Sequence, residues 1–367
     1  MKILTFLKSH AVLCIAVFAA AVTVFFVPPD AEYASYFDFA TLGCLFATLA
    51  VVCALGEIHF FEFLARKIVV KFKNVRAIVF ALVFITYFGS MILANDMALI
   101  TFLPLGYFAL SRTGKEKYMA FTFVMQNVAA NLGGMLTPFG NPQNLYLYSY
   151  FGIPTAEFLG IMLPTFLAAF VLIVACCFFV KKETAELTDD VTFPVKPVRL
   201  VLLLLFFVLS VLSVMRVYSW YIGVGLALIG VAVIRPQAYR SVNYSLLLTF
   251  CAFFVFSGNL SRISAVHELI GGLLNRNVLL FSILSCQVIS NVPTATLLCR
   301  FTGAYAPLLV GVNVGGLGTP IASLASLITL GSYRSQGGNV GRYLLIFSAV
   351  NFSFVLLLGL VGALFAG

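Results

Sequence analysis

The chain has 367 residues, of which 62% are hydrophobic and only 10% are charged, and its mean hydropathy is +1.08. Soluble globular domains carry about 25% charged residues, so this composition excludes that class and indicates an integral membrane protein. The net charge of +9 would suit a nucleic-acid binder, but the Lys and Arg residues lie in short loops between apolar runs. That pattern is typical of membrane orientation, and no nucleic-acid partner is expected. The eight cysteines lack metal-ligand spacing, so neither a metal site nor a disulfide framework is expected.

The first half of the chain, 1–180, predicts full spans, an interfacial segment, a hairpin and a broken helix. A crossing needs about 20 apolar residues, but the polar pair Asn95-Asp96 divides the run 76–110 into flanks of roughly 15 residues. Such a run suits a re-entrant hairpin with its tip at this pair. In chain order we expect scaffold spans at 11–27 and 38–56, an amphipathic interfacial helix at 57–73, the hairpin at 76–110, a broken helix at 118–150 and a span at 156–180.

A polar linker at 181–199 leads into the second half, 200–367, which repeats the order of elements with one extra span. The extra span reverses the direction in which the second half enters the membrane. The fold class we predict is therefore an all-α membrane protein with two inverted-topology repeats and about nine full crossings, as in secondary transporters. The expected elements are spans at 199–216, 218–234 and 244–259, a hairpin at 277–303 with its tip at Ser290-Asn291, a broken helix at 304–334 and a last span at 341–365.

The distribution of basic residues predicts the orientation of these elements in a cell (plasma) membrane. With a cytoplasmic N-terminus, four of the 22 Lys and Arg residues fall outside and the other 18 fall on the cytoplasmic side. This positive-inside bias makes the linker cytoplasmic, opens the first hairpin inward and opens the second outward. Six aromatic residues then lie at outer boundaries as membrane anchors: Tyr146, Tyr148, Tyr150, Tyr218, Trp220 and Tyr221.

Two glycine- and proline-rich stretches indicate where a binding site forms. Asn-Leu-Gly-Gly-Met-Leu-Thr-Pro at 131–138 aligns without gaps with Asn-Val-Gly-Gly-Leu-Gly-Thr-Pro at 313–320. Glycine and proline interrupt helices and leave backbone groups unpaired, which is tolerated at membrane depth only inside protein or around a polar cavity. Matched breaks in two halves point to a transporter's site, and a plain helix-packing role is the alternative. The candidates are Asn131, Gly133, Gly134, Thr137, Pro138, Asn141 and Asn144, with Asn313, Gly315, Gly316, Thr319 and Pro320.

The hairpin tips provide the remaining candidate residues. Asp96 is the only acidic residue expected at mid-membrane depth, where a charge costs roughly 2.5–3.5 kcal/mol unless it meets a proton, a cation or a polar cavity. Desolvation favours its protonated form and a bound Na⁺ favours its charged form, so both roles stay open. Capping of the second half-helix is the alternative for Asp96 and for the tip asparagines. The second tip adds Ser290, Asn291 and Thr294, and a transient Na⁺ ion would use Asn95, Asp96 and Asn291.

These motifs resemble the ion transporter superfamily, which includes arsenite permeases, Na⁺/H⁺ antiporters, citrate transporters and divalent-anion/Na⁺ symporters. The resemblance covers essentially the whole chain and rests on the two breaks and on Ala-Asn-Asp-Met-Ala-Leu-Ile-Thr at 94–101. It implies a mobile transport domain of hairpins and broken helices, a scaffold domain that dimerises, and elevator-type alternating access. The Asn95-Asp96 tip is similar to that of arsenite permeases, whereas Gly-Asn-Pro-Gln-Asn at 140–144 resembles the Gly-Asp-Pro-Pro-Asn of citrate-transporter-like relatives.

The sequence predicts a secondary active transporter for a small anion or oxyanion, such as citrate or a dicarboxylate, coupled to H⁺ or Na⁺. Arsenite or antimonite efflux and Na⁺/H⁺ exchange are alternatives within this class, and a channel or non-transporting membrane sensor is the alternative outside it. No zinc, nucleotide, haem or hydrolase motif appears, so neither an enzyme nor a cofactor is expected. The expected partners are a small-molecule or ion substrate, the lipid bilayer and a second copy in a homodimer.

A single site shared by both halves would be lined by residues of both tips and both breaks. We expect Asn131→Ala and Asn313→Ala each to weaken ligand binding while folding stays intact. The residues expected to share this site are Asn95, Asn131, Thr137, Asn141, Asn291, Asn313 and Thr319.

Overall fold

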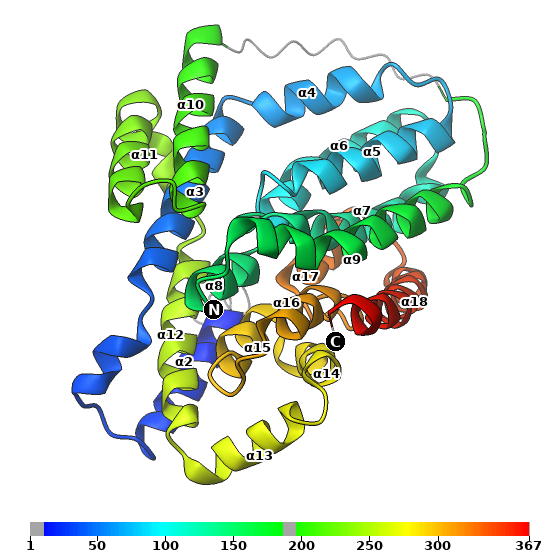
Figure 1. Cartoon of the computed structure of the whole chain (residues 1–367). Helices are drawn as coiled ribbons and strands as arrows, with labels where there is room; N and C mark the ends of the chain where they lie inside the picture. Colours follow the sequence, from blue (N-terminus) through cyan, green and yellow to red (C-terminus); the bar gives the residue numbers. More distant parts are fainter. Residues whose placement is uncertain (1–10, 186–195, 367) are drawn as a thin grey trace, which may run out of the picture.

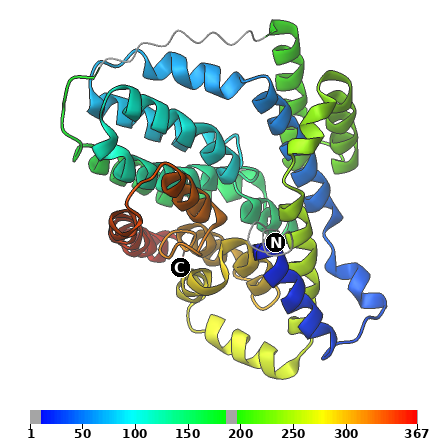
Figure 2. The ribbon, with the colours of Figure 1, turned by 180° about the vertical axis from the view of Figure 1, so that it is seen from behind.

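The computed structural model describes residues 11–185 and 196–366, and the regular structure in these residues is entirely helical. This confirms the all-α class. Figures 1 and 2, seen from opposite sides, show one group of helices along one flank of the molecule, which we call the scaffold. In the scaffold α2 packs on α12, and α3 packs on α10 and α11. The scaffold helices are α2 (Ala11–Val24), α3 (Phe39–Glu57), α10 (Pro197–Val214), α11 (Trp220–Ile234) and α12 (Tyr244–Ser261).

The remaining helices form a second group, which we call the bundle, beside the scaffold (Figure 1). Its first part comprises α5 (Val75–Gly89), α6 (Asn95–Arg112), α7 (Met119–Gly133), α8 (Pro142–Tyr150) and α9 (Thr155–Cys177). Its second part comprises α14 (Val278–Ile289), α15 (Asn291–Leu298), α16 (Tyr305–Val314), α17 (Leu324–Ser335) and α18 (Val340–Phe365). The connecting helices are α4 (Phe60–Val69) and α13 (Ser264–Leu274), with short 3₁₀ turns at Ala31–Tyr36, Glu116–Tyr118, Gly134–Leu136 and Pro236–Ser241.

The two parts of the bundle have matching neighbours. α5 packs on α7 as α14 packs on α16, and α6 contacts α17 as α15 contacts α8. The long last helices also correspond, because α18 lies against α7 while α9 lies against α16, and the two contact each other. The hairpin α5–α6 therefore contacts α7, the first half of its own broken helix, and α17, the second half of the other broken helix. The hairpin α14–α15 likewise contacts α16 and α8.

Helix ends fall where the glycine and proline residues predict them. In the first break α7 ends at Gly133 and α8 begins with Pro142, whose fixed φ and missing N–H suit the first position of a helix. In the second break the chain turns through Gly318 at φ 102°, which only glycine adopts without strain. The helices of the two hairpins are separated by residues 90–94 in one case and by Ser290 alone in the other.

Five helices in the described part of the chain are long and apolar enough to cross a bilayer, namely α3, α9, α10, α12 and α18. The pair α13–α14 would add a sixth, but it is bent by 119°. α2, α5, α11 and α16 are apolar with 10–17 residues, which is shorter than the roughly 20 residues of a straight crossing. The nine crossings and their inverted arrangement stay predictions.

Two of the expected membrane anchors are instead buried packing residues. Tyr146 is 1% exposed, its ring packs tilted against that of Phe254 with the ring centroids 5.3 Å apart, and its hydroxyl lies 3.4 Å from the sulfur of Cys299. Tyr148 is 2% exposed, and its hydroxyl is 2.7 Å from that of Thr155. The anchor prediction is wrong for these residues because α8 is enclosed by neighbouring helices and does not face lipid.

The start of the linker is bound to the loops of the first half, while 186–195 lies outside the described residues. Glu183 accepts hydrogen bonds from Lys117 at 2.7 Å, from the Tyr118 hydroxyl at 2.7 Å and from Lys115 at 2.9 Å. These donors hold the pKa of the Glu183 carboxyl at about 2. The end of α9 is thereby fixed to the loop between α6 and α7.

We predict that Gly133→Ala destabilises the protein, because a Cβ atom there would lie 2.0 Å from the backbone oxygen of Tyr87 in α5. Overpacking of this kind costs about 1–3 kcal/mol or more. The matched control is Gly160→Ala on α9, where a Cβ would meet nothing within 4 Å. Thermal unfolding in detergent should show a lower midpoint for Gly133→Ala only, and equal midpoints for the two variants would contradict the packing role.

Candidate functional site

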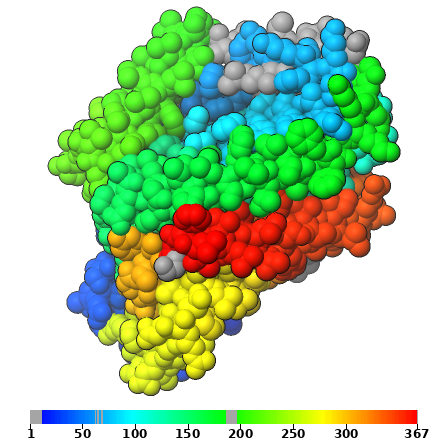
Figure 3. Space-filling model, turned by 45° about the vertical axis from the view of Figure 1, so that its right-hand side comes forward, coloured from blue at the N-terminus to red at the C-terminus, as the bar shows by residue number. Residues whose placement is uncertain are grey.

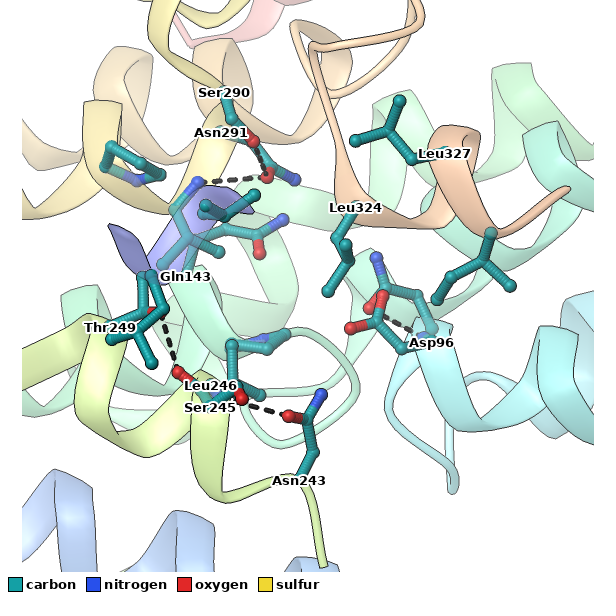
Figure 4. Close-up of a pocket in the computed structure, with 17 residues that line it drawn as sticks. Asp96, Gln143, Asn243, Ser245, Leu246, Thr249, Ser290, Asn291, Leu324 and Leu327 are labelled. Carbon is teal, nitrogen blue, oxygen red and sulfur yellow. Dashed lines mark hydrogen bonds between the residues drawn. The ribbon is translucent and has the colours of Figure 1, made fainter. Parts of the chain in front are cut away.

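A cavity of about 420 Å³ lies where both hairpin tips meet the N-terminal part of α12 (Figure 4). The bundle contributes the tips and the starts of α8 and α17, and the scaffold contributes residues of α2 and α12. Among the described lining residues Asp96 is the only charged one, and the other polar side chains carry amides or hydroxyls. The polar lining residues are Asn95, Asp96, Gln143, Asn243, Ser245, Thr249, Ser290 and Asn291.

Besides α2, whose described part starts at Ala11 and contributes Val12 and Leu13, five helices begin at this cavity. Its lining contains residues from the first two turns of α6, α8, α12, α15 and α17. The N-terminus of a helix carries roughly half a positive elementary charge and readily binds anions. Among residues 11–185 and 196–366 the lining has no Lys or Arg. Within this part of the chain the positive potential of the cavity therefore comes from helix ends, and the Asp96 carboxylate is the only full charge that meets it.

At the first tip, Asn95 is bound to the first break while Asp96 faces the cavity. The Asn95 side chain accepts from the backbone N–H of Asp96 at 2.9 Å and donates to the side-chain oxygen of Asn131 at 3.3 Å. Asp96 is 7% exposed, and its carboxylate has no hydrogen bond or ion pair within the described ranges. The N-cap of α6 is Ala94, without a side-chain cap. The capping alternative for Asp96 is therefore wrong.

The second tip has the same local geometry and is fastened to the second break. The Asn291 side chain accepts from the backbone N–H of Val292 at 2.9 Å, just as the Asn95 side chain accepts from the backbone N–H of Asp96. Ser290 has φ 73°, a conformation that costs free energy for a residue other than glycine. Two hydrogen bonds to the carbonyl oxygen of Ala322 support this backbone conformation. One comes from the Ser290 hydroxyl at 3.2 Å and the other from the Asn291 backbone N–H at 2.9 Å. Thr294 donates to the Ser290 carbonyl at 2.7 Å and does not line the cavity.

Asn313 joins the two breaks through a buried cluster of amides behind the cavity. Its side-chain oxygen accepts from Asn141 at 3.1 Å and from Gln143 at 3.2 Å. Its side-chain nitrogen donates to the side-chain oxygen of Asn144 at 2.6 Å. Asn141 also donates to the backbone oxygen of Asn131 at 3.0 Å. The asparagines of both breaks therefore belong to one network, of which Gln143 reaches the cavity.

The threonines of the two breaks bind the hairpins and do not line the cavity. The Thr137 hydroxyl donates to the backbone oxygen of Met91 at 2.8 Å, and the Thr319 hydroxyl donates to that of Gln287 at 3.1 Å. Pro138 and Pro320 lie in the irregular segments that follow each break and are also absent from the lining.

The paired glycines allow close approach of neighbouring atoms. A Cβ at Gly134 would lie 2.4 Å from the side-chain oxygen of Asn141, and one at Gly316 would lie 2.9 Å from the side-chain nitrogen of Asn291. At Gly315 it would lie 2.9 Å from the Cβ of Cys286. These positions shape the network and are not themselves ligands in the cavity.

Sequence reasoning missed several residues of the site. Gln143 and Asn141 each have a buried side-chain oxygen without a partner in the described part of the chain, and Gln143 was not among the candidates. The Asn127 side-chain amide donates to the hydroxyl of Ser326 in α17 at 3.3 Å. Asn127 precedes Asn131 by one helical turn, so this spacing of buried amides could have identified it. The scaffold residues Asn243 and Thr249 carry no motif.

Comparison with known proteins identifies the family. Residues 3–310 match CitMHS, the citrate transporter family. The chain is 31% identical over 312 residues to the uncharacterized transporter MJ0456 of Methanocaldococcus jannaschii, covering 84% of this chain and 85% of that protein. It is 30% identical over 313 residues to the inner membrane protein YbiR of Escherichia coli, covering 83% of each. A shorter match, 31% over 143 residues, is to the silicon efflux transporter LSI3 of Oryza sativa subsp. japonica, covering 39% of this chain and 29% of that one.

The apolar helices, the interrupted helices around a polar cavity and these relatives define an integral membrane transporter. The chain belongs to the citrate transporter family, CitMHS. This confirms the resemblance to the ion transporter superfamily and the prediction of a transporter instead of an enzyme.

The Asn313 network changes one expectation from the sequence. Asn313→Ala removes the partner of three side-chain amides, and each buried polar group left unsatisfied costs about 1–3 kcal/mol. We now expect this variant to lose stability as well as ligand binding, with a lower midpoint of thermal unfolding. Asn275→Ala, at an exposed asparagine, is the control. An Asn313→Ala midpoint equal to the control's would show that the network contributes nothing to folding.

Proposed function

We propose that this protein is a secondary active transporter that moves a small anion or oxyanion, such as citrate or a dicarboxylate, coupled to H⁺ or Na⁺. The observation that carries the proposal is the convergence of five helix N-termini on a cavity whose lining, within the described residues, contains one carboxylate and no Lys or Arg. Helix ends and amide groups attract an anion without a fixed cation. Binding an anion without a salt bridge to Lys or Arg suits a transporter, because the substrate must be released on the other side of the membrane.

Asp96 provides a physical basis for coupling. Two unit negative charges about 4 Å apart at an effective dielectric constant of about 20 repel by roughly 4 kcal/mol. An anion in the cavity therefore favours protonation of Asp96, and protonation of Asp96 favours the anion. A Na⁺ ion held by oxygens of Asn95, Asp96 and Asn291 would relieve the same repulsion. We favour the proton, because neutral Asp96 also removes the charge when the cavity is empty.

The matching neighbours of the two bundle parts support an inverted-repeat, elevator-type mechanism. In this proposal the bundle carries the cavity across the membrane against the scaffold, and α2 and α12 supply the fixed wall. The positive-inside bias supports a cytoplasmic N-terminus, with the first hairpin opening inward and the second outward. The exposed apolar side chains of α11, including Tyr221, Ile229 and Val233, offer a surface for a homodimer in the plasma membrane.

A second candidate is efflux of an uncharged oxyacid, such as arsenite or antimonite in its protonated form. The observation that favours it is the dense set of amides and hydroxyls in a lining whose described residues include no basic side chain. Such groups hydrogen-bond a neutral hydroxylated solute as well as an anion. The silicon efflux activity named for the partially matching rice relative is consistent with this alternative.

We predict that Asp96→Asn separates substrate binding from proton coupling. The variant mimics the protonated carboxyl, so it should bind and exchange substrate while losing accumulation driven by a pH gradient. If Na⁺ is the coupling ion, the variant should instead lose the Na⁺ dependence of substrate affinity. The measurement is uptake in proteoliposomes under separate pH and Na⁺ gradients, with the exposed Glu116→Gln as control. Undiminished accumulation under both gradients would remove Asp96 from the mechanism.

We predict that anions stabilise the protein more than neutral oxyacids do. A ligand that binds the folded state raises stability by about 2.7 kcal/mol at a concentration of 100 times its Kd. Thermal unfolding with citrate, succinate, phosphate, arsenite and silicic acid distinguishes the two candidates. Stabilisation by arsenite or silicic acid alone would favour the second candidate over the first.

A further inference from the structure

We propose that a second, apolar cavity between α10 and α5 binds an acyl chain of an anionic phospholipid, whose phosphate is held by basic residues at the cavity's rim. The cavity has a volume of about 480 Å³, within the range of roughly 300–1,000 Å³ that is typical of ligand sites. It shares no lining residue with the polar cavity. In Figure 3 the hollow lies between the green α10–α11 pair and the cyan region of α5.

The described residues that wall this cavity present hydrocarbon to it. α5 contributes Ala81, Phe84, Ile85 and Phe88, whose spacing of three and four residues makes one continuous helix face. α10 contributes Leu204 and Phe207, and the end of α3 with the start of α4 adds Leu55, Phe60 and Phe61. Every described lining residue is apolar, so these residues offer water no hydrogen-bond partner from a side chain. In a protein surrounded by lipid, an acyl chain is the occupant with matching chemistry.

Basic residues lie at one end of these walls. Phe72 lines the cavity between the exposed Lys71 and Lys73. Lys196 and Arg199 lie at the start of α10, eight and five residues before Leu204, which is within about 12 Å along the helix at 1.5 Å per residue. Figure 1 shows α4 and the start of α10 at the same edge of the molecule.

The charge at this rim selects an anionic headgroup. None of the four cations is paired with a carboxylate of residues 11–185 or 196–366. Basic clusters beside a membrane attract anionic lipids, with about 1 kcal/mol, or about fivefold in affinity, for each Lys or Arg near the surface. A free phosphate would bind only the basic residues at the rim, and a neutral lipid would bind only in the apolar cavity. An anionic phospholipid uses both.

One consequence rests on the proposed function. The cavity lies at the boundary between the scaffold helix α10 and the bundle helix α5. If the bundle moves against the scaffold, a lipid chain held here must slide or leave in each cycle. The content of anionic lipid in the membrane would then change the transport rate without changing substrate affinity.

The test is native mass spectrometry of the purified full-length protein with dioleoylphosphatidylglycerol or dioleoylphosphatidylcholine added in detergent. The wild type should retain more phosphatidylglycerol than phosphatidylcholine. Ala81→Phe fills the cavity and should abolish this preference, whereas Ala363→Phe at an exposed position of α18 should keep it. Lys71→Gln combined with Lys196→Gln should weaken retention of phosphatidylglycerol by about fivefold for each cation removed.

Equal retention of the two lipids by the wild type would overturn the proposal, as would an unchanged preference in the Lys71→Gln/Lys196→Gln variant. These two lysines are exposed, so the variant should fold even if Ala81→Phe does not. The measurement counts bound lipid and not transport. A protein that transports normally but shows no lipid preference would refute this inference alone, and a transport-inactive protein with the expected preference would refute the proposed function alone.

Discussion

Backbone carbonyls that are released at a helix break inside a membrane must find partners within the protein, and the arrangement of this molecule depends on how it meets that constraint. In the first break the side-chain amide of Asn144 donates to the carbonyl oxygens of Gly134, Met135 and Thr137 at 3.0–3.3 Å. In the second break the amide of Gln287 donates to those of Gly315 and Leu317 at 2.9 and 3.0 Å. One primary amide in each half thus stabilises an unwound segment that lipid could not solvate.

These breaks and the two hairpin tips determine the electrostatics of the polar cavity. Each interruption starts a new helix, and the new N-termini of α6, α8, α15 and α17 meet that of α12 at one place. In the proposed function, partial positive charges from helix ends replace the fixed cations that an anion site in a soluble protein would use. Asp96 sits among these ends with no basic partner among the described residues, so its charge state responds to whatever occupies the cavity.

The sequence alone predicts the positions of the interruptions well, because glycine and proline act locally. α7 ends at Gly133, α8 begins at Pro142, and α6 and α15 begin at the predicted tips Asn95 and Asn291. Contacts between distant segments could not be predicted in this way. Gln287 lies in a hairpin arm, about 30 residues before the carbonyls that it binds, and no local pattern marks it.

The same limit applies to which residues face the cavity. Thr137 and Thr319 match in sequence, but both are used to fasten the breaks to the hairpins. Asn243 and Thr249 of the scaffold line the cavity because α12 is folded against it, and nothing in their own sequence neighbourhood indicates this. Tyr146 was expected at a membrane boundary, yet it is buried, because hydropathy does not distinguish a helix that faces lipid from one enclosed by other helices.

The proposed function requires, as its central claim, that the polar cavity opens alternately to the two sides of the membrane. The most direct measurement places a single cysteine at Leu327, which lines the cavity, in a variant without the eight native cysteines. The protein is inserted into sealed vesicles and labelled with a membrane-impermeant thiol reagent from each side in turn. Alternating access predicts labelling from both sides, with a ratio that shifts when a pH or Na⁺ gradient is applied. Labelling from one side only, under every gradient, would contradict the account.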